Sequence, residues 1–192
     1  MRVGDHLVGS QRRSQRITPA VDQLEGRMVL STVAMSASSH DHLAAAALIP
    51  PLRPYSFLVG TSVYRLTKAD GSTVRAVLKD SVAAGGTELT AVRRELSPTR
   101  ASASFVTSYD ASTGQVVQDG VNGSTTFHGV LHRTGPKTFV TDGVVTGPAG
   151  VPEVQTKLTI VRVSPRISVY LQQRLVGESY QTTEAGTLRR LG

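Results

Sequence analysis

Two histidines four residues apart, His128 and His132, are the first residues whose type and spacing could do chemistry. On a helix, this spacing would place both imidazoles on one face, where they could share a metal ion. The neighbouring Thr126, Phe127 and Val130 favour a strand instead, and on a strand the two positions lie ~13 Å apart. The histidines are therefore predicted to point the same way without sharing an ion, and no metal site is expected.

Other candidate chemistry is sparse. Serine and threonine are abundant, but no Gly-x-Ser-x-Gly elbow occurs. His40 and His42 flank Asp41 in a polar stretch, which is better interpreted as a solvated linker than as a weak copper or zinc site. Cysteine is absent, which excludes disulfides, thiolate nucleophiles and Cys-ligated metals. No catalytic residue and no cofactor are predicted, and a protein without enzymatic activity is favoured over an enzyme.

The elements that must position these residues begin after residue 54 and are mainly strands. Residues 62–80 alternate between apolar and polar side chains around the turn Ala69-Asp70-Gly71-Ser72, which predicts a β-hairpin. Turn signals then recur about every 8 to 12 residues, as in antiparallel sandwiches and barrels. Further strands are predicted at residues 102–110, 115–120, 124–133, 138–147, 154–163 and 167–176, followed by a terminal piece at 179–191.

One stretch breaks this alternation. Leu89, Val92 and Leu96 repeat at helical spacing, and the segment is bounded by a residue that can cap a helix, Thr87, and one that ends it, Pro98. A short helix is therefore predicted over residues 87–96.

Sequential, hairpin-linked strands predict a mainly β fold, an antiparallel meander that closes into an up-and-down barrel, with a β-sandwich as the alternative. The body resembles the calycin type of barrel, the lipocalin and avidin group, in architecture only. Because the chain has no Trp, the Gly-x-Trp of lipocalins and the ring-rich biotin pocket of avidin are excluded. If the barrel has a polar interior, His128, His132 and Arg174 are predicted to converge there as candidate ligand-binding residues.

The charge of the chain does not indicate a nucleic-acid partner. The net charge is +7, but residues 1–53 carry six Arg against four acids, and residues 54–192 carry fifteen Lys or Arg against ten acids. Basic residues fall singly or in pairs, with few aromatics beside them, whereas nucleic-acid grooves cluster both. A small ligand or a cell-envelope component is the predicted partner.

A change in composition near residue 53 divides the chain into three parts. Residues 1–37 are interpreted as an export or sorting segment, disordered or loosely helical, residues 38–54 as a linker, and residues 55–192 as the β-domain. Pro50, Pro51 and Pro54 disfavour a continuous helix in the linker. Its apolar run is also far shorter than the ~20 residues of a membrane span, so no transmembrane helix is predicted.

The stretch LEGRMVLS, residues 24–31, resembles the LEPR-xLL class of N-terminal motif found at the front of many exported bacterial proteins. Basic residues before it, an apolar run at 28–35 and small residues after it agree with an export segment. The alternative is an amphipathic helix docked on the barrel. The resemblance implies export from a bacterial cell and says nothing about activity. The favoured function is an exported β-domain with a binding or cell-envelope structural role, and the alternative is a secreted enzyme with a polar barrel interior.

Overall fold

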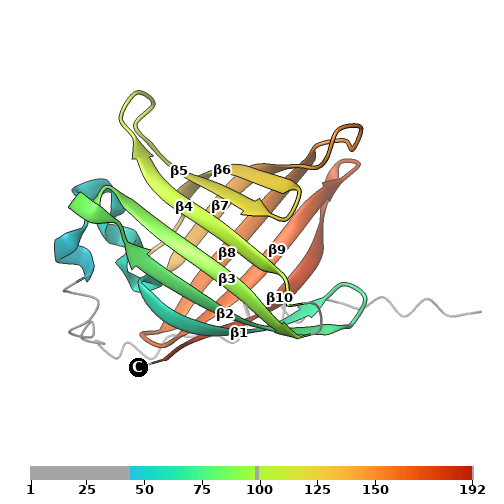
Figure 1. Cartoon of the computed structure of the whole chain (residues 1–192), viewed down its shortest axis with the longest axis horizontal. Helices are drawn as coiled ribbons and strands as arrows, with labels where there is room; N and C mark the ends of the chain where they lie inside the picture. The colour runs from blue at the N-terminus through green and yellow to red at the C-terminus, as the bar shows by residue number, and fades with distance from the viewer. Residues whose placement is uncertain (1–43, 98–99, 192) are drawn as a thin grey trace, which may run out of the picture. The chain divides into compact units, whose positions relative to one another are not determined.

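The computed structural model describes residues 44–97 and 100–191, and ten strands of this part of the chain form a closed antiparallel barrel (Figure 1). Among these described residues, helical structure is confined to one turn at residues 44–47 and to the 3-10 helices η1 (Pro50–Leu58) and η2 (Ala84–Gly86). The strands are β1 (Gly60–Lys68), β2 (Thr73–Val82), β3 (Glu88–Ser97), β4 (Ser102–Asp110), β5 (Gln115–Asn122), β6 (Thr125–Arg133), β7 (Thr138–Thr146), β8 (Val154–Ser164), β9 (Ile167–Val176) and β10 (Ser179–Leu191).

The topology is an up-and-down meander, so the predicted barrel is confirmed and the sandwich is not formed. Each strand pairs antiparallel with its neighbours in sequence, and β1 also pairs with β10, which leaves no free edge. The alternation of side chains along each strand decides which of them face the interior of the barrel. In β1, for example, Tyr64 and Leu66 are buried inside, whereas Arg65 and Thr67 are exposed.

The helix predicted over residues 87–96 is wrong, because Glu88–Ser97 is strand β3. Leu89 is buried, but Val92 and Leu96 are exposed, so the three residues never shared a helical face. The strand pattern was hidden because the inward positions change along β3 from apolar Leu89 and Ala91 to charged Arg93 and Glu95, which line the barrel cavity. A polar interior thus removes the alternation on which strand prediction depends.

One end of the barrel is filled by η1 and the residues before it (Figure 1). Leu48, Leu52, Tyr55 and Phe57 are buried in one cluster with residues from β3, β5, β6 and β7. The ring centroids of Phe57 and Phe139 are 4.5 Å apart. Leu48 and Leu52, which lie within the predicted linker of residues 38–54, therefore pack into this end of the barrel.

The predicted export segment, residues 1–37 with the LEGRMVLS motif, lies outside the described residues. Within the described part of the chain, no helix has the length and apolar character needed to cross a membrane.

Candidate ligand-binding cavity

A cavity of about 340 Å³ occupies the barrel interior. Its apolar wall comes from β4, β6 and β8, where Phe105, Phe127, Leu158 and Ile160 face inward. Its polar wall comes mainly from β1, β2, β3, β9 and β10. The polar lining includes Tyr64, Asp80, Arg93, Glu95, Tyr170, Gln172 and Glu184. A cavity with one apolar and one polar wall has the general character of a small-molecule site.

The cavity opens at the end of the barrel away from η1. Val116, at the start of β5, packs in the cluster around η1, whereas Val121 and Asn122, at the other end of the same strand, are exposed and line the cavity. Thr126, just past the β5–β6 turn, is also exposed and lines it. The mouth therefore lies beside this turn.

Two aromatic rings of the apolar wall lie against glycines of neighbouring strands. A Cβ atom at Gly120 would stand 2.5 Å from a ring carbon of Phe105, and one at Gly143 would stand 2.6 Å from a ring carbon of Phe127. Both distances are below van der Waals contact, so a larger residue would displace the ring. At Gly143 the added Cβ would also stand 2.5 Å from the backbone carbonyl oxygen of His128, so the backbone of β6 would have to move as well. The absence of a side chain at these glycines lets the rings lie close to the barrel wall, which keeps the interior open.

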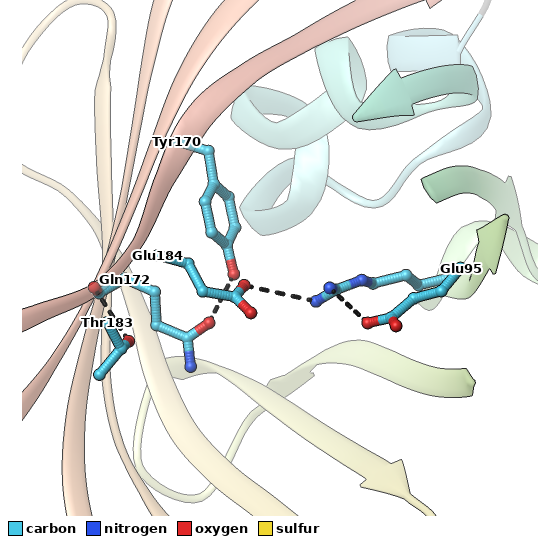
Figure 2. A network of polar contacts seen from close by, with 6 residues as sticks. Glu95, Tyr170, Gln172, Thr183 and Glu184 are labelled. Atoms are coloured by element: carbon cyan, nitrogen blue, oxygen red, sulfur yellow. Dashed lines mark hydrogen bonds and ion pairs between the residues drawn. The ribbon is translucent and has the colours of Figure 1, made fainter. Parts of the chain in front are cut away.

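An ion-pair and hydrogen-bond network crosses the polar wall (Figure 2). Arg93 Nη2 donates to Glu95 Oε1 at 3.0 Å on the same strand, and Arg93 Nη1 lies 3.8 Å from Glu184 Oε2 on β10. The Tyr170 hydroxyl donates to Gln172 Oε1 at 2.8 Å. Because β3 and β10 are separated in the barrel by β1 and β2, the Arg93–Glu184 ion pair links strands that are not neighbours.

A β-bulge in β10 sets the position of Glu184. The pairing between β9 and β10 shifts between Thr182 and Glu184, so that Glu184 pairs with Gln172 on the inner face. The extra residue, Thr183, donates its hydroxyl to the Gln172 carbonyl at 3.1 Å (Figure 2). Bulges commonly re-aim side chains at functional sites, and this one directs a carboxylate into the cavity.

Two tyrosines lie beside this network. The rings of Tyr64 and Tyr170 meet edge to face with centroids 5.7 Å apart. Burial raises the pKa of Tyr64 well above its usual value; Tyr170 and Asp80 raise it further, and Arg93 opposes them. Burial also raises the pKa of Tyr170, with a further contribution from Glu184. Both phenols therefore stay protonated and act in the cavity as neutral hydrogen-bonding groups.

Asp80 is the most perturbed acid of the cavity wall. It follows the inward-facing Val74, Ala76 and Leu78 on β2 and is only 7% exposed. Burial raises its pKa to about 8, although Arg190 opposes the shift. Its Oδ2 has no hydrogen-bond partner. At neutral pH this side chain is therefore mostly a neutral carboxylic acid.

The structure does not bring together the three predicted ligand-binding residues. His128 projects from the outer face of β6, where its Nδ1 lies 2.7 Å from Asp119 Oδ1, with a side chain 68% exposed. His132 is also exposed, with its Nε2 3.6 Å from Asp142 Oδ2.

Arg174 occupies the inner face of β9, since it pairs with the cavity residue Thr156, but its side chain is exposed near the strand end. A ligand-binding role for the three residues stays a prediction.

Sequence reasoning missed the residues that form the polar wall, although two signals were present. Alternation along β2 continues from Val74 through Ala76 and Leu78 to Asp80, which marks this acid as inward-facing. Alternation along β9 likewise links Tyr170 and Gln172. No comparable signal exists for Glu184, because the bulge before it is not marked in the sequence.

Comparisons with known proteins support the fold alone. No protein-family model matches the chain, and no curated protein matches its sequence. The crystal structure of Rv2717c from M. tuberculosis is similar with a TM-score of 0.55 at 16% identity, covering 76% of this chain and 99% of that chain. A redesigned β-barrel, mFAP1, bound to DFHBI, has a TM-score of 0.37 at 17% identity, covering 70% of this chain and 95% of that chain. The similarity to Rv2717c concerns the fold alone, and at 16% identity it carries no information about ligands.

Proposed function

We propose that this protein is a non-catalytic barrel that binds a small molecule in its interior. The observation that carries this proposal is the cavity of about 340 Å³, closed at one end by η1 and open beside the β5–β6 turn. A barrel with a purely structural role gains stability by filling its interior, because each void forfeits packing energy. Here Gly120 and Gly143 instead keep aromatic rings close to the wall and leave the space open.

A secreted enzyme is the second candidate, and the observation that favours it is Asp80. A carboxyl group with a pKa of about 8 can act as a general acid at neutral pH. Binding remains favoured because, among the described residues, those that line the cavity include neither serine nor histidine. The commonest activated nucleophile and general base are therefore not contributed by this wall.

The test of binding uses a neutral, apolar fluorescent probe such as N-phenyl-1-naphthylamine, whose emission rises in apolar surroundings. Wild-type protein should enhance the emission with saturable binding. Ala103→Phe should weaken this binding by about tenfold or more, because Ala103 is buried and lines the cavity, so the ring occupies ligand space.

Ala185→Phe is the matched control. Ala185 precedes the inward-facing Gly186 on β10, so the same ring is added to the outer wall. If the wild type binds the probe and Ala103→Phe binds it equally well, the probe lies outside the barrel, and this result would contradict the proposal. No saturable binding would favour a structural role in the cell envelope.

We further propose that the protein is exported from a bacterial cell. The support is the resemblance of residues 24–31 to the LEPR-xLL motif, with basic residues before it and a short apolar run after it. Intact mass and N-terminal sequencing of protein recovered from the native cells and medium test this directly. A mature start between residues 37 and 53 supports export, and an intact Met1 in the cytoplasm contradicts it.

A further inference from the structure

Basic residues gather on one sector of the barrel rim, at the end that η1 closes. They come from the β6–β7 turn, from the β8–β9 turn with its flanking strand ends, and from the end of β10, which lie at the same end as η1 (Figure 1). We call the following six residues the basic rim: Arg133, Lys137, Arg162, Arg166, Arg189 and Arg190. Residues 133–138, 162–167 and 189–191 include no aspartate or glutamate, so these segments contribute positive charge only.

Backbone hydrogen bonds place the three segments side by side. The amide of Arg162 donates to the carbonyl of Lys137 at 2.8 Å, which joins the end of β8 to the β6–β7 turn. The amide of Arg190 donates to the carbonyl of Arg166 at 2.8 Å, which joins the end of β10 to the β8–β9 turn. Arg162, Arg166 and Arg190 also line one small cavity at this end. The basic residues therefore share one continuous surface.

Most of this charge faces solvent without a carboxylate partner. Four side chains of the basic rim are exposed and form no ion pair with another described residue: Arg133, Lys137, Arg166 and Arg189. Arg133 donates to the carbonyls of Gly135 and Pro136, which orients its side chain without neutralising it. Asp80 lines the small cavity, but it is buried, and its raised pKa leaves it mostly neutral.

Exposed aliphatic residues lie among these charges. Each follows an arginine of the basic rim in the chain, and the three are Val163, 43% exposed, Ile167, 42% exposed, and Leu191, 52% exposed. Ile167 also pairs with Arg189 across β9 and β10. Aliphatic side chains that can enter the lipid head-group region, beside basic ones that attract anionic lipids, characterise elements that lie on a membrane surface.

The charge at the opposite end of the barrel is mixed. Around the mouth, the ends of the strands and the described turns carry both signs: Lys68, Asp70, Arg100, Glu153 and Glu178. Exposed aliphatic residues occur there as well, for example Val151 and Val176. Apolar exposure therefore does not distinguish the two ends, whereas the excess of positive charge does.

A nucleic acid would use the same charges but different neighbours. Grooves that bind single strands add aromatic rings on which the bases stack. The three segments of the basic rim include no aromatic residue. The guanidinium of Arg162 lies 5.5 Å from the ring centroid of Phe57, but this ring is buried in the barrel end. The aliphatic neighbours favour lipid over nucleic acid.

We propose that the closed end of the barrel is a docking surface for membranes that contain anionic phospholipids. The basic rim contacts the lipid phosphates, and Val163, Ile167 and Leu191 enter the head-group region. Because the mouth of the cavity lies at the other end of the barrel, the docked protein keeps this mouth away from the lipid. The inference concerns a second surface and does not depend on the proposed ligand-binding function.

The first test measures co-sedimentation of the full chain with sucrose-loaded vesicles at about 0.1 M salt. Vesicles with equal amounts of phosphatidylcholine and phosphatidylglycerol should bind the protein about tenfold or more tightly than vesicles of phosphatidylcholine alone, because each basic residue near an anionic surface strengthens binding. Raising the salt to about 0.5 M should weaken this binding by about tenfold, because the attraction is screened. Equal binding to the two kinds of vesicle, or binding that salt leaves unchanged, overturns the proposal.

Charge reversal locates the contact on the barrel. Arg166→Glu combined with Arg189→Glu should weaken binding to the anionic vesicles by about tenfold or more. Arg65→Glu combined with Arg75→Glu is the matched control, because these two exposed arginines pair with each other on the outer wall of β1 and β2. The control makes the same change in net charge and should leave binding within about threefold of wild type.

Both double variants should keep the sheet, as far-UV circular dichroism shows, and should bind the neutral probe, since none of the four arginines lines the large cavity. Unchanged vesicle binding in the Arg166 and Arg189 variant would place the contact elsewhere on the chain and overturn the proposal. Equal weakening in both double variants would mean that net charge alone governs binding, which also overturns it.

A third test separates lipid from nucleic acid. Leu191→Ser should weaken binding to the anionic vesicles by about threefold or more, whereas Leu96→Ser, on the outer wall of β3 and likewise 52% exposed, should leave it unchanged. Duplex DNA at the same concentration of phosphate should bind more weakly than the vesicles. Tighter binding of DNA that Leu191→Ser leaves unchanged would assign the basic rim to a nucleic acid and overturn the membrane proposal.

Discussion

Replacing Asp80 with asparagine should stabilise the barrel at alkaline pH and change its stability little in acid. Asp80 is buried, and its Oδ2 has no hydrogen-bond partner. Burial raises its pKa from 3.8 to about 8, while Arg190 opposes the rise. Asparagine has nearly the same shape and cannot ionise, so it removes the cost of a buried charge without opening a void.

The direction of this pH dependence follows from the number of protons bound in the folded and in the unfolded state. Between about pH 4 and about pH 8, Asp80 is protonated in the folded protein and ionised in the unfolded chain, so the folded state binds more protons and stability falls as the pH rises. Each pKa unit corresponds to about 1.4 kcal/mol. Over the interval from 3.8 to about 8, wild type should therefore lose on the order of 6 kcal/mol that Asp80→Asn retains.

Urea denaturation followed by circular dichroism at several pH values between about 4 and about 9 measures this difference. The free energy of unfolding of Asp80→Asn minus that of wild type should grow steadily with pH and level off above about 8. Asp119→Asn, at an exposed position on the outer face, is the control and should stay within about 0.5 kcal/mol of wild type. A difference between Asp80→Asn and wild type that does not depend on pH would refute the reasoning.

Three further predictions concern packing. Leu52→Ala should lower the free energy of unfolding in urea by about 2–5 kcal/mol, because this η1 residue is 0% exposed. Leu96→Ala, at a site 52% exposed, should lower it by less than about 1 kcal/mol. Equal losses in the two variants would mean that η1 does not fill the barrel end. Gly120→Ala should destabilise the barrel by about 1–3 kcal/mol and reduce probe binding, because its methyl group displaces a phenylalanine ring into the cavity. Gly135→Ala, where the added methyl group has no contact below 3.6 Å, should change neither stability nor binding. Unchanged probe binding in Gly120→Ala would contradict the role of this glycine. Tyr55→Phe should lower the free energy of unfolding by about 1 kcal/mol, measured by thermal or urea denaturation, because it removes the 3.3 Å hydrogen bond to a backbone carbonyl of β6. An unchanged free energy of unfolding would show that this bond does not stabilise the barrel end.

The candidate site was less predictable than the fold, and single residues show why. Asp80 could be assigned to the inner face, since it continues the alternation of its strand. Arg93 and Glu95 could not, because charged inward residues conceal the alternation of β3 and leave an accidental helical spacing. Glu184 depends on a bulge that the local sequence does not mark.

The sequence by itself determined most of the strands, though not β3, and the turns that join them, because alternation and turn residues act over short distances. It also determined that no disulfide or thiolate contributes, since cysteine is absent. The tertiary structure alone decided which polar residues meet. Closure pairs β1 with β10, more than a hundred residues later in the chain, and so brings Glu184 toward Arg93 across the interior. It also placed η1 in one end of the barrel, because the buried partners of Leu52 come from strands that are distant in sequence. Contacts of this range depend on the curvature and register of the whole sheet, which no local pattern encodes.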